Sequence, residues 1–252
     1  MNILNRFRRS PAPAAPPPAS LPEGLRVYAI GDIHGRLDLL ETLLARIGAD
    51  DAARDACRTQ LIFLGDLVDR GPESAAVVER AIGLHTAGAR FLMGNHEEML
   101  LRMLDGDIAA LRAMVRVGAR ETILSYGVSE AAYDASDFEE LAELFAARVP
   151  DEHVAFLRGC EDRILLGDYL FVHAGVRPAV PLGEQSPSDL RWIRREFLDC
   201  EDDHGYVVVH GHSISETVEE RPNRIGIDTG AYASGRLTAV GLEGADRWYL
   251  ET

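Results

Sequence analysis

The sequence has 252 residues, of which 46% are hydrophobic and 27% are charged, and its formal net charge is −15 at pH 7. These values are ordinary for a globular protein with a substantial core. A chain this acidic is a poor candidate for binding nucleic acid or an anionic membrane surface. No apolar run approaches the ~18 residues that span a bilayer. The N-terminus lacks the apolar region of a secretory signal.

The three cysteines, Cys57, Cys160 and Cys200, have neither disulfide-like nor metal-clip spacing. Their free state suits a reducing compartment. We therefore expect a cytoplasmic protein with no nucleic-acid partner and no membrane partner. The sequence leaves the oligomeric state open.

The chain divides at its Pro/Ala-rich start. Residues 11–22 read PAPAAPPPASLP, a composition that cannot bury a core. We predict a disordered extension over residues 1–25 and one folded domain over residues 26–252.

Strand-like and helix-like segments alternate from Arg26 onward. RVYAIGD, QLIFLGD and ARFLMGN are short apolar runs, separated by LDLLETLLARIG and ESAAVVERAIGLHTAG, whose apolar residues recur at helical spacing. This alternation predicts βαβ units with parallel strands. A helical stretch, including IAALRAMVRVGARETILSYG and DFEELAELFAARV, follows from Glu97 to about Arg158.

The second half reads DYLFVHAG, YVVVHGH, NRIGIDTG, GRLTAVGLEG and DRWYLET. The later runs lie too close together for crossover helices, so part of this half should be antiparallel. The expected fold class is α/β: a β-sandwich of mixed sheets flanked by helices, with a helical insertion over residues 97–158.

Polar clusters follow five of the strand-like runs. They are Gly31-Asp32-Ile33-His34-Gly35, Gly65-Asp66-Leu67-Val68-Asp69-Arg70-Gly71, Gly94-Asn95-His96-Glu97, His173-Ala174-Gly175 and His210-Gly211-His212. Ligands of open α/β sheets bind at the carboxyl ends of the strands. Asp, Asn and His together offer oxygens and imidazole nitrogens, which suit Mn²⁺, Fe or Zn²⁺. Six such side chains suffice for two metal ions if one carboxylate bridges them, and such a pair can activate water for in-line displacement.

The series GDIHG, GDLVDRG and GNHE, followed by FVHAG and VHGHS, resembles the phosphoprotein phosphatase branch of the calcineurin-like metallophosphoesterases. The resemblance extends from about Arg26 to about Gly244. It implies a hydrolase that cleaves a phosphate ester with a hydroxide held between two divalent metal ions, most often Mn²⁺.

The resemblance also implies a role for each matching position. Asp32 and His34 would hold the first metal ion, Asp66 would bridge both, and Asn95, His173 and His212 would complete the second. His96 would protonate the leaving oxygen, with Asp69 orienting it. Arg70 and Arg194 would bind the phosphate; Arg194 has close neighbours, Arg191 and Arg195, as rivals for that role.

The substrate is less determined than the chemistry. Glu97 in GNHE and Asp69 in GDLVDRG favour a serine/threonine protein phosphatase of the bacterial or phage type, acting on a phosphoprotein or a small phosphoester. The alternative is a symmetrical dinucleoside tetraphosphate hydrolase. A second alternative is a non-catalytic scaffold, although every expected ligand, His96 and Arg70 are present.

Two further residues stand out without an assigned role. His210 lies two positions before His212, and the sequence leaves open whether it supports the metal site. Gly226 is an unusual residue for the strand-like run RIGID.

Overall fold

The computed structural model describes residues 18–252. The predicted extension falls largely on residues 1–17, which lie outside the described residues. Its boundary at residue 26 is too late, because Leu21 is buried and its amide donates to the Gly244 carbonyl at 2.9 Å. The amide of Ser20 also bonds to the carboxylate of Asp168 at 2.9 Å.

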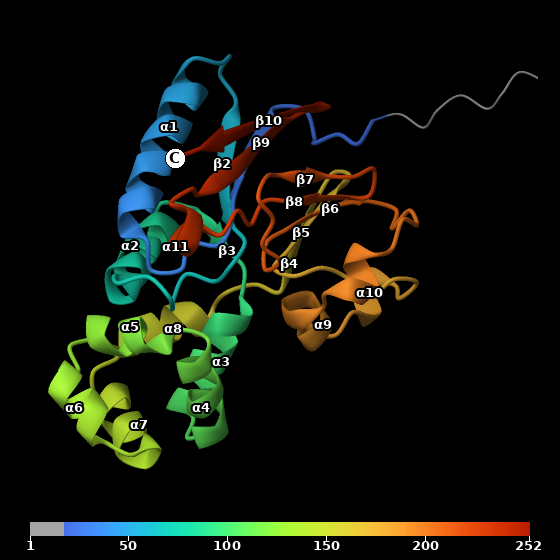
Figure 1. Cartoon of the computed structure of the whole chain (residues 1–252). Coiled ribbons are helices and arrows are strands. Elements are labelled where there is room, and N and C mark those ends of the chain that lie inside the picture. The colour runs from blue at the N-terminus through green and yellow to red at the C-terminus, as the bar shows by residue number, and fades with distance from the viewer. Residues whose placement is uncertain (1–17) are drawn as a thin grey trace, which may run out of the picture.

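Two five-stranded mixed sheets form the centre of the molecule, which confirms the predicted fold class (Figure 1). The first sheet has the order β10-β9-β1-β2-β3, with β1–β2 and β2–β3 parallel and the remaining pairs antiparallel. Its strands are β1 (Leu25–Ile30), β2 (Arg58–Phe63), β3 (Arg90–Phe91), β9 (Thr238–Glu243) and β10 (Asp246–Glu251).

The second sheet has the order β4-β5-β6-β8-β7, with β5–β6 and β6–β8 parallel and both edge pairs antiparallel. Its strands are β4 (Arg163–Leu166), β5 (Tyr169–Val172), β6 (Val207–His210), β7 (Glu219–Glu220) and β8 (Arg224–Gly226). The predicted antiparallel character of the second half is therefore found at β9 and β10 and at this sheet's edges.

Alternating side chains of the strands divide the core into layers. Val27 and Ala29 of β1 meet Tyr169 and Phe171 of β5 in the cluster between the sheets. The intervening Tyr28 and Ile30 face the other way, in a cluster with the helices that cover the first sheet. On the outer face of the second sheet, Leu170, Val172 and Val208 pack against Leu190, Ile193 and Phe197.

Helices cover both outer faces of the sandwich (Figure 1). The first sheet carries α1 (Leu37–Ala52), α2 (Ser74–Thr86) and the short α11 (Ala231–Ser234). Beside the second sheet lie α9 (Pro187–Trp192) and α10 (Arg195–Leu198), preceded by a 3₁₀ turn at Leu182–Glu184. The sequence pattern did not predict α9 and α10, which are only one to two turns long.

The predicted helical insertion consists of six short helices gathered at one end of the sandwich (Figure 1). They are α3 (Asn95–Leu104), α4 (Ile108–Arg116), α5 (Ala119–Ser125), α6 (Glu130–Ala135), α7 (Phe138–Ala146) and α8 (Asp151–Arg158). The run expected to be helical through residues 108–127 breaks at Gly118, whose φ of 110° only glycine adopts readily. Within residues 18–252, no helix has both the length and the apolar character needed to cross a bilayer.

Candidate active site

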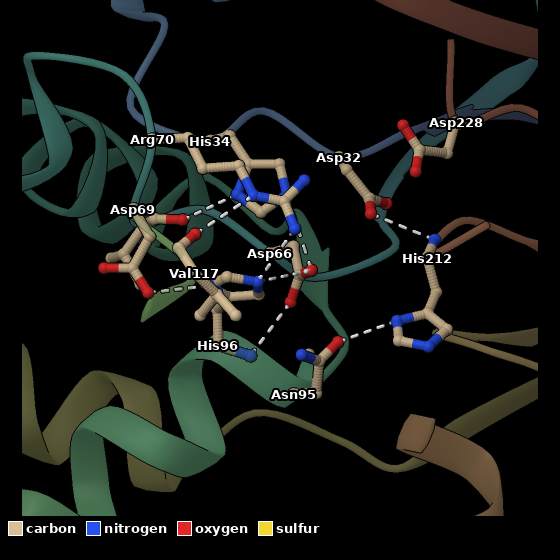
Figure 2. Close-up of polar contacts among 12 residues, drawn as sticks. Asp32, His34, Asp66, Asp69, Arg70, Asn95, His96, Val117, His212 and Asp228 are labelled. Atoms are coloured by element: carbon tan, nitrogen blue, oxygen red, sulfur yellow. Dashed lines mark hydrogen bonds and ion pairs between the residues drawn. The ribbon is translucent and has the colours of Figure 1, made fainter. Parts of the chain in front are cut away.

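The five polar clusters of the sequence lie where strands of both sheets end. Figure 2 shows Asp32, Asp66, Asn95 and His212, from four of these clusters, gathered together. Asp32 and His34 follow β1, Asp66 and Asp69 follow β2, and Asn95 and His96 begin α3 after β3. His173 and His212 follow β5 and β6 of the second sheet. All of these side chains are buried. The site therefore lies at the junction of the two sheets.

One half of the site is built around the Asn95 side-chain oxygen. That oxygen lies 2.9 Å from His173 Nε2 and 2.8 Å from His212 Nδ1. His173 Nε2 is also 3.4 Å from Asp66 Oδ1. Candidate ligand atoms of Asp66, His173 and His212 all lie within 4.8 Å of one another, close enough to surround one ion.

The other half of the site also includes Asp66. His34 Nε2 lies 3.6 Å from Asp66 Oδ2, and His96 Nε2 lies 3.8 Å from the same oxygen. A second group of candidate ligand atoms within 4.8 Å of one another comes from His34, Asp66 and His96. Asp32 accepts a hydrogen bond from the His212 amide at 2.9 Å through Oδ2.

Backbone carbonyls orient two of the imidazoles. His34 Nδ1 donates to the Val68 carbonyl at 2.8 Å, and His173 Nδ1 donates to the Leu64 carbonyl at 2.7 Å. Each bond fixes the proton on Nδ1 and turns Nε2, the unprotonated nitrogen, toward Asp66. This is the usual arrangement of histidines that bind metals.

The electrostatics keep these histidines neutral and Asp66 charged. Burial lowers the pKa of His34 to about 3 and lowers the pKa values of His173 and His212 as well. Burial alone would raise the pKa of Asp66, but the surrounding imidazoles outweigh it and the net pKa is below the usual range. Neutral imidazole and ionised carboxylate are the forms that bind metal ions.

The remaining polar atoms also fit a metal centre. Asp32 Oδ1 and His212 Nε2 are buried without a hydrogen-bond partner among the described residues, and buried polar groups ordinarily have one. A Cβ on Gly211 would lie 2.0 Å from Asp32 Oδ1, and one on Gly94 would lie 2.3 Å from Asp66 Oδ1. Glycine at both positions leaves these oxygens accessible. Nitrogen and oxygen donors without thiolate suit Mn²⁺, Fe or Zn²⁺.

A second cluster of polar residues lies beside Asp66. His96 Nδ1 is 2.6 Å from Asp69 Oδ2, and both side chains are buried. Burial lowers the pKa of His96, but the charges of Asp66 and Asp69 and the Asp69 hydrogen bond outweigh it, so the net pKa is raised. Arg70 Nη2 lies 3.4 Å from His96 Nε2, and the Arg70 guanidinium stands 4.5 Å from the ring centre of half-exposed Tyr232. This cluster places an imidazole with a raised pKa and a guanidinium next to the candidate metal ligands.

Arg194 is the candidate second phosphate arginine. Arg194 is exposed, and its charge is among the causes that lower the pKa values of His173 and His212. Its rival Arg191 is engaged elsewhere, bonding to Asp162 Oδ1 at 3.0 Å and to Glu98 Oε2 at 3.2 Å. The geometry thus favours Arg194 over Arg191 for a role at the site.

The sequence did not predict the contacts that Glu97, Thr122 and Asp228 make at the site. Glu97 accepts amide hydrogen bonds from Asp66, Leu67 and Gly94 at 2.8–3.0 Å and so holds two of the loops together. Thr122 donates to Asp69 Oδ1 at 2.6 Å. Asp228 follows β8 and is buried near Asp32 (Figure 2). Its signal was an Asp after the strand-like run RIGI, the same pattern as Asp32 and Asp66.

His210 makes no hydrogen bond to the six predicted ligand side chains. Its ring Nδ1 donates to the Gly211 carbonyl at 3.0 Å, and the ring packs edge-on against Phe197, 5.1 Å between centres. A Cβ at position 226 would lie 3.0 Å from His210 Cε1. The unusual Gly226 therefore leaves room for the buried His210 ring.

Comparison with known proteins identifies the family of the chain. The family described as Calcineurin-like phosphoesterase matches residues 25–238. A symmetrical bis(5'-nucleosyl)-tetraphosphatase from Acidovorax sp. (strain JS42) is 38% identical over 154 residues, 61% of this chain and 45% of that protein. The asymmetrical bis(5'-nucleosyl)-tetraphosphatase PrpE from Bacillus subtilis (strain 168) is 29% identical over 227 residues, 83% of this chain and 87% of that protein. The chain thus spans less than half of the symmetrical relative.

Solved structures share the fold. A structure provisionally assigned as a diadenosine tetraphosphatase has a TM-score of 0.63 at 22% identity, covering 90% of this chain and 93% of that chain. A protein serine/threonine phosphatase from Saccharomyces cerevisiae has a TM-score of 0.52 at 15% identity, covering 90% of this chain and 79% of that chain. With the family match over residues 25–238 and the convergence of the strand-end ligands, the chain belongs to the calcineurin-like phosphoesterases.

Proposed function

We propose that this protein hydrolyses dinucleoside tetraphosphates with the help of two divalent metal ions. Phosphoester hydrolysis is the activity of its family. The proposed substrate rests on the names of two kinds of relatives that match the chain, the symmetrical and asymmetrical bis(5'-nucleosyl)-tetraphosphatases. The asymmetrical relative matches 83% of the chain.

Each part of the site has a role in this proposal. Asp32, His34, Asp66, Asn95, His173 and His212 would hold the ions, which when bound supply Lewis-acid activation of water and neutralise phosphate charge. Arg70 and Arg194 would bind phosphate oxygens, for which the planar guanidinium offers parallel donors. His96 would donate a proton to the departing phosphate oxygen, and Asp69 would hold its ring in place.

The preference for a protein phosphatase drawn from the sequence rested on Glu97 and Asp69. The Glu97 carboxylate bonds to the backbone of the site loops and is fully buried, so it does not face a substrate. Asp69 bonds to His96, which serves the cleavage of any phosphate ester. Neither residue distinguishes a phosphoprotein from a dinucleotide, so a serine/threonine protein phosphatase is the second candidate function.

The test uses metal-stripped protein supplied with Mn²⁺ and given diadenosine tetraphosphate, a phosphothreonine peptide or p-nitrophenyl phosphate in parallel. We expect the highest kcat/KM on the dinucleotide, with metal-dependent turnover that Asp66→Asn abolishes. Chromatography identifies the cleaved bond, because symmetrical cleavage gives two ADP and asymmetrical cleavage gives ATP and AMP.

Other outcomes decide against the proposal. A higher kcat/KM on the phosphopeptide would restore the protein phosphatase. No turnover of any of the three substrates by protein shown to contain metal would favour the non-catalytic scaffold.

A further inference from the structure

The turn after β2 holds its two functional residues in a strained backbone. Asp69 has a φ of 72° and Arg70 a φ of 71°, in the left-handed region that residues other than glycine rarely adopt. Such conformations persist where surrounding contacts determine them, and they concentrate at functional sites. The contacts that hold this turn therefore bear on the geometry of the acid and of the phosphate arginine.

The Asp69 amide bonds to Ser74 Oγ of α2 at 3.0 Å, and two further contacts come from the helical insertion. The Arg70 amide donates to the Gly118 carbonyl at 2.8 Å, and the Asp69 amide bonds to Thr122 Oγ1 at 2.8 Å. Gly118 precedes α5 and Thr122 lies within it, about fifty residues later in the chain. A Cβ on Gly118 would lie 2.8 Å from Arg70 Cγ, so glycine is needed for this approach. The start of α5 is thus bonded to both strained residues.

Thr122 also fixes the Asp69 carboxylate. Its single hydroxyl proton goes to Asp69 Oδ1, 2.6 Å away, while its oxygen accepts from the Asp69 amide and from the Ser74 hydroxyl at 2.9 Å. With Oδ1 occupied, Oδ2 faces His96 Nδ1 at 2.6 Å. Asp69, Ser74 and Thr122 are all fully buried, so water does not offer a substitute partner.

We propose that Thr122 is a positioning residue, through which the helical insertion sets the orientation of Asp69 and thereby of the His96 ring. The proposal rests on the role suggested above for His96. It gives the insertion a part in the reaction as well as in the walls of the site. Loss of the Thr122 hydroxyl leaves Asp69 Oδ1 buried without a donor and frees the carboxylate to turn away from His96.

The experiment compares Thr122→Val, which keeps the shape, with Thr122→Ser, which keeps the hydroxyl. The control is Ser125→Ala, because Ser125 lies in the same helix and makes two hydrogen bonds that do not involve Asp69. Proton NMR of the Zn²⁺-loaded, diamagnetic protein detects the downfield resonance of the His96 ring proton, assigned by its loss in Asp69→Asn. The kcat and KM of each Mn²⁺-loaded variant are measured on diadenosine tetraphosphate and p-nitrophenyl phosphate.

We expect Thr122→Val to shift or broaden the His96 resonance and to lower kcat about tenfold or more, with KM changed less than about twofold. Thr122→Ser and Ser125→Ala should keep both the resonance and kcat. An unchanged resonance in a folded Thr122→Val protein, or a loss in Thr122→Ser equal to that in Thr122→Val, overturns the proposal. A Thr122-dependent resonance in a protein that hydrolyses neither compound contradicts the proposed function and leaves the positioning intact.

Discussion

At the residue scale, the buried carboxyl groups of the site lie close together, which lowers the stability of the metal-free fold when they are ionised. Burial raises the pKa of Asp228 to about 6, and the charge of Asp66 adds to the shift. Burial also raises the pKa of Asp32, with the charges of Asp228 and Asp66 contributing. Such crowding of carboxylates is relieved when a cation binds, so it is a feature of a metal centre more than of a structural core.

The crowding gives a prediction for Asp228→Asn in metal-free protein. The folded state keeps the Asp228 proton up to about pH 6, whereas the unfolded chain releases it near its ordinary pKa of about 3.9. Stability therefore falls as the pH rises from 4 to 6. We expect Asp228→Asn to be more stable than the wild type by about 1–3 kcal/mol at pH 7, a gain absent below pH 4. Urea unfolding with a chelator present, across this pH range, measures it.

The asparagine is a matched replacement, since its side-chain oxygen still accepts the hydrogen bond that Asp228 Oδ1 receives from the Gly230 amide at 3.0 Å. A variant that is equally destabilised at every pH would contradict the electrostatic explanation and would indicate a lost contact instead.

Single residues also show what a sequence reveals about a site. Asp32, Asp66 and His173 follow strands directly, so their proximity can be predicted from the rule that strand ends carry ligands. Thr122 is different. It reaches Asp69 only through the packing of a helix 53 residues away, and nothing in the residues around it marks that contact. The sequence pattern therefore predicts the side chains that meet at strand ends, and not the residues that hold them there.

At the scale of secondary-structure elements, the sequence pattern predicts the long elements better than the short ones. The long helices α1 and α2 and every strand except β4 and β7 correspond to runs that the sequence pattern predicted. The strand β7 has two residues, and α9 and α10 have six and four, too few for a period to be recognised. The Gly118 break between α4 and α5 is imposed by the close approach to Arg70, which is a tertiary contact.

The junction of α1 with the first sheet gives a prediction about stability. Asp50, near the end of α1, accepts from Tyr28 Oη at 2.6 Å, Trp248 Nε1 at 2.9 Å and Arg54 Nε at 2.8 Å. Tyr28 is fully buried, so Asp50→Ala leaves its hydroxyl without this partner. We expect a loss of about 1–3 kcal/mol in the free energy of unfolding, measured by urea titration.

The matched control is Asp38→Ala in the first turn of the same helix. The Asp38 carboxylate is largely exposed and pairs with Arg36, so its removal should change stability by less than about 1 kcal/mol. Equal losses in the two variants would mean that the effect comes from helix propensity and not from the contacts with β1 and β10.

At the scale of the whole molecule, the site joins two sheets that otherwise meet through an apolar layer. Asp32, His34, Asp66 and Asn95 extend from the first sheet, whereas His173 and His212 extend from the second. Metal ions that bind this set stabilise the folded state, because the unfolded chain does not hold the six side chains together.

Metal binding should therefore raise the melting temperature in proportion to the logarithm of metal concentration. A free ion concentration 100-fold above Kd adds about 2.7 kcal/mol, which corresponds to about 5–10 °C for a domain of this size. Calorimetry of chelator-treated protein, titrated with Mn²⁺ and separately with Zn²⁺, measures the shift. Asp66→Asn should lose most of it, because Asp66 belongs to both groups of ligand atoms. Glu143→Gln, which removes an exposed charge on α7, should keep it. A shift of the same size in Asp66→Asn would place the bound metal outside this site, since among residues 18–252 only Asp66 is common to both groups of ligand atoms.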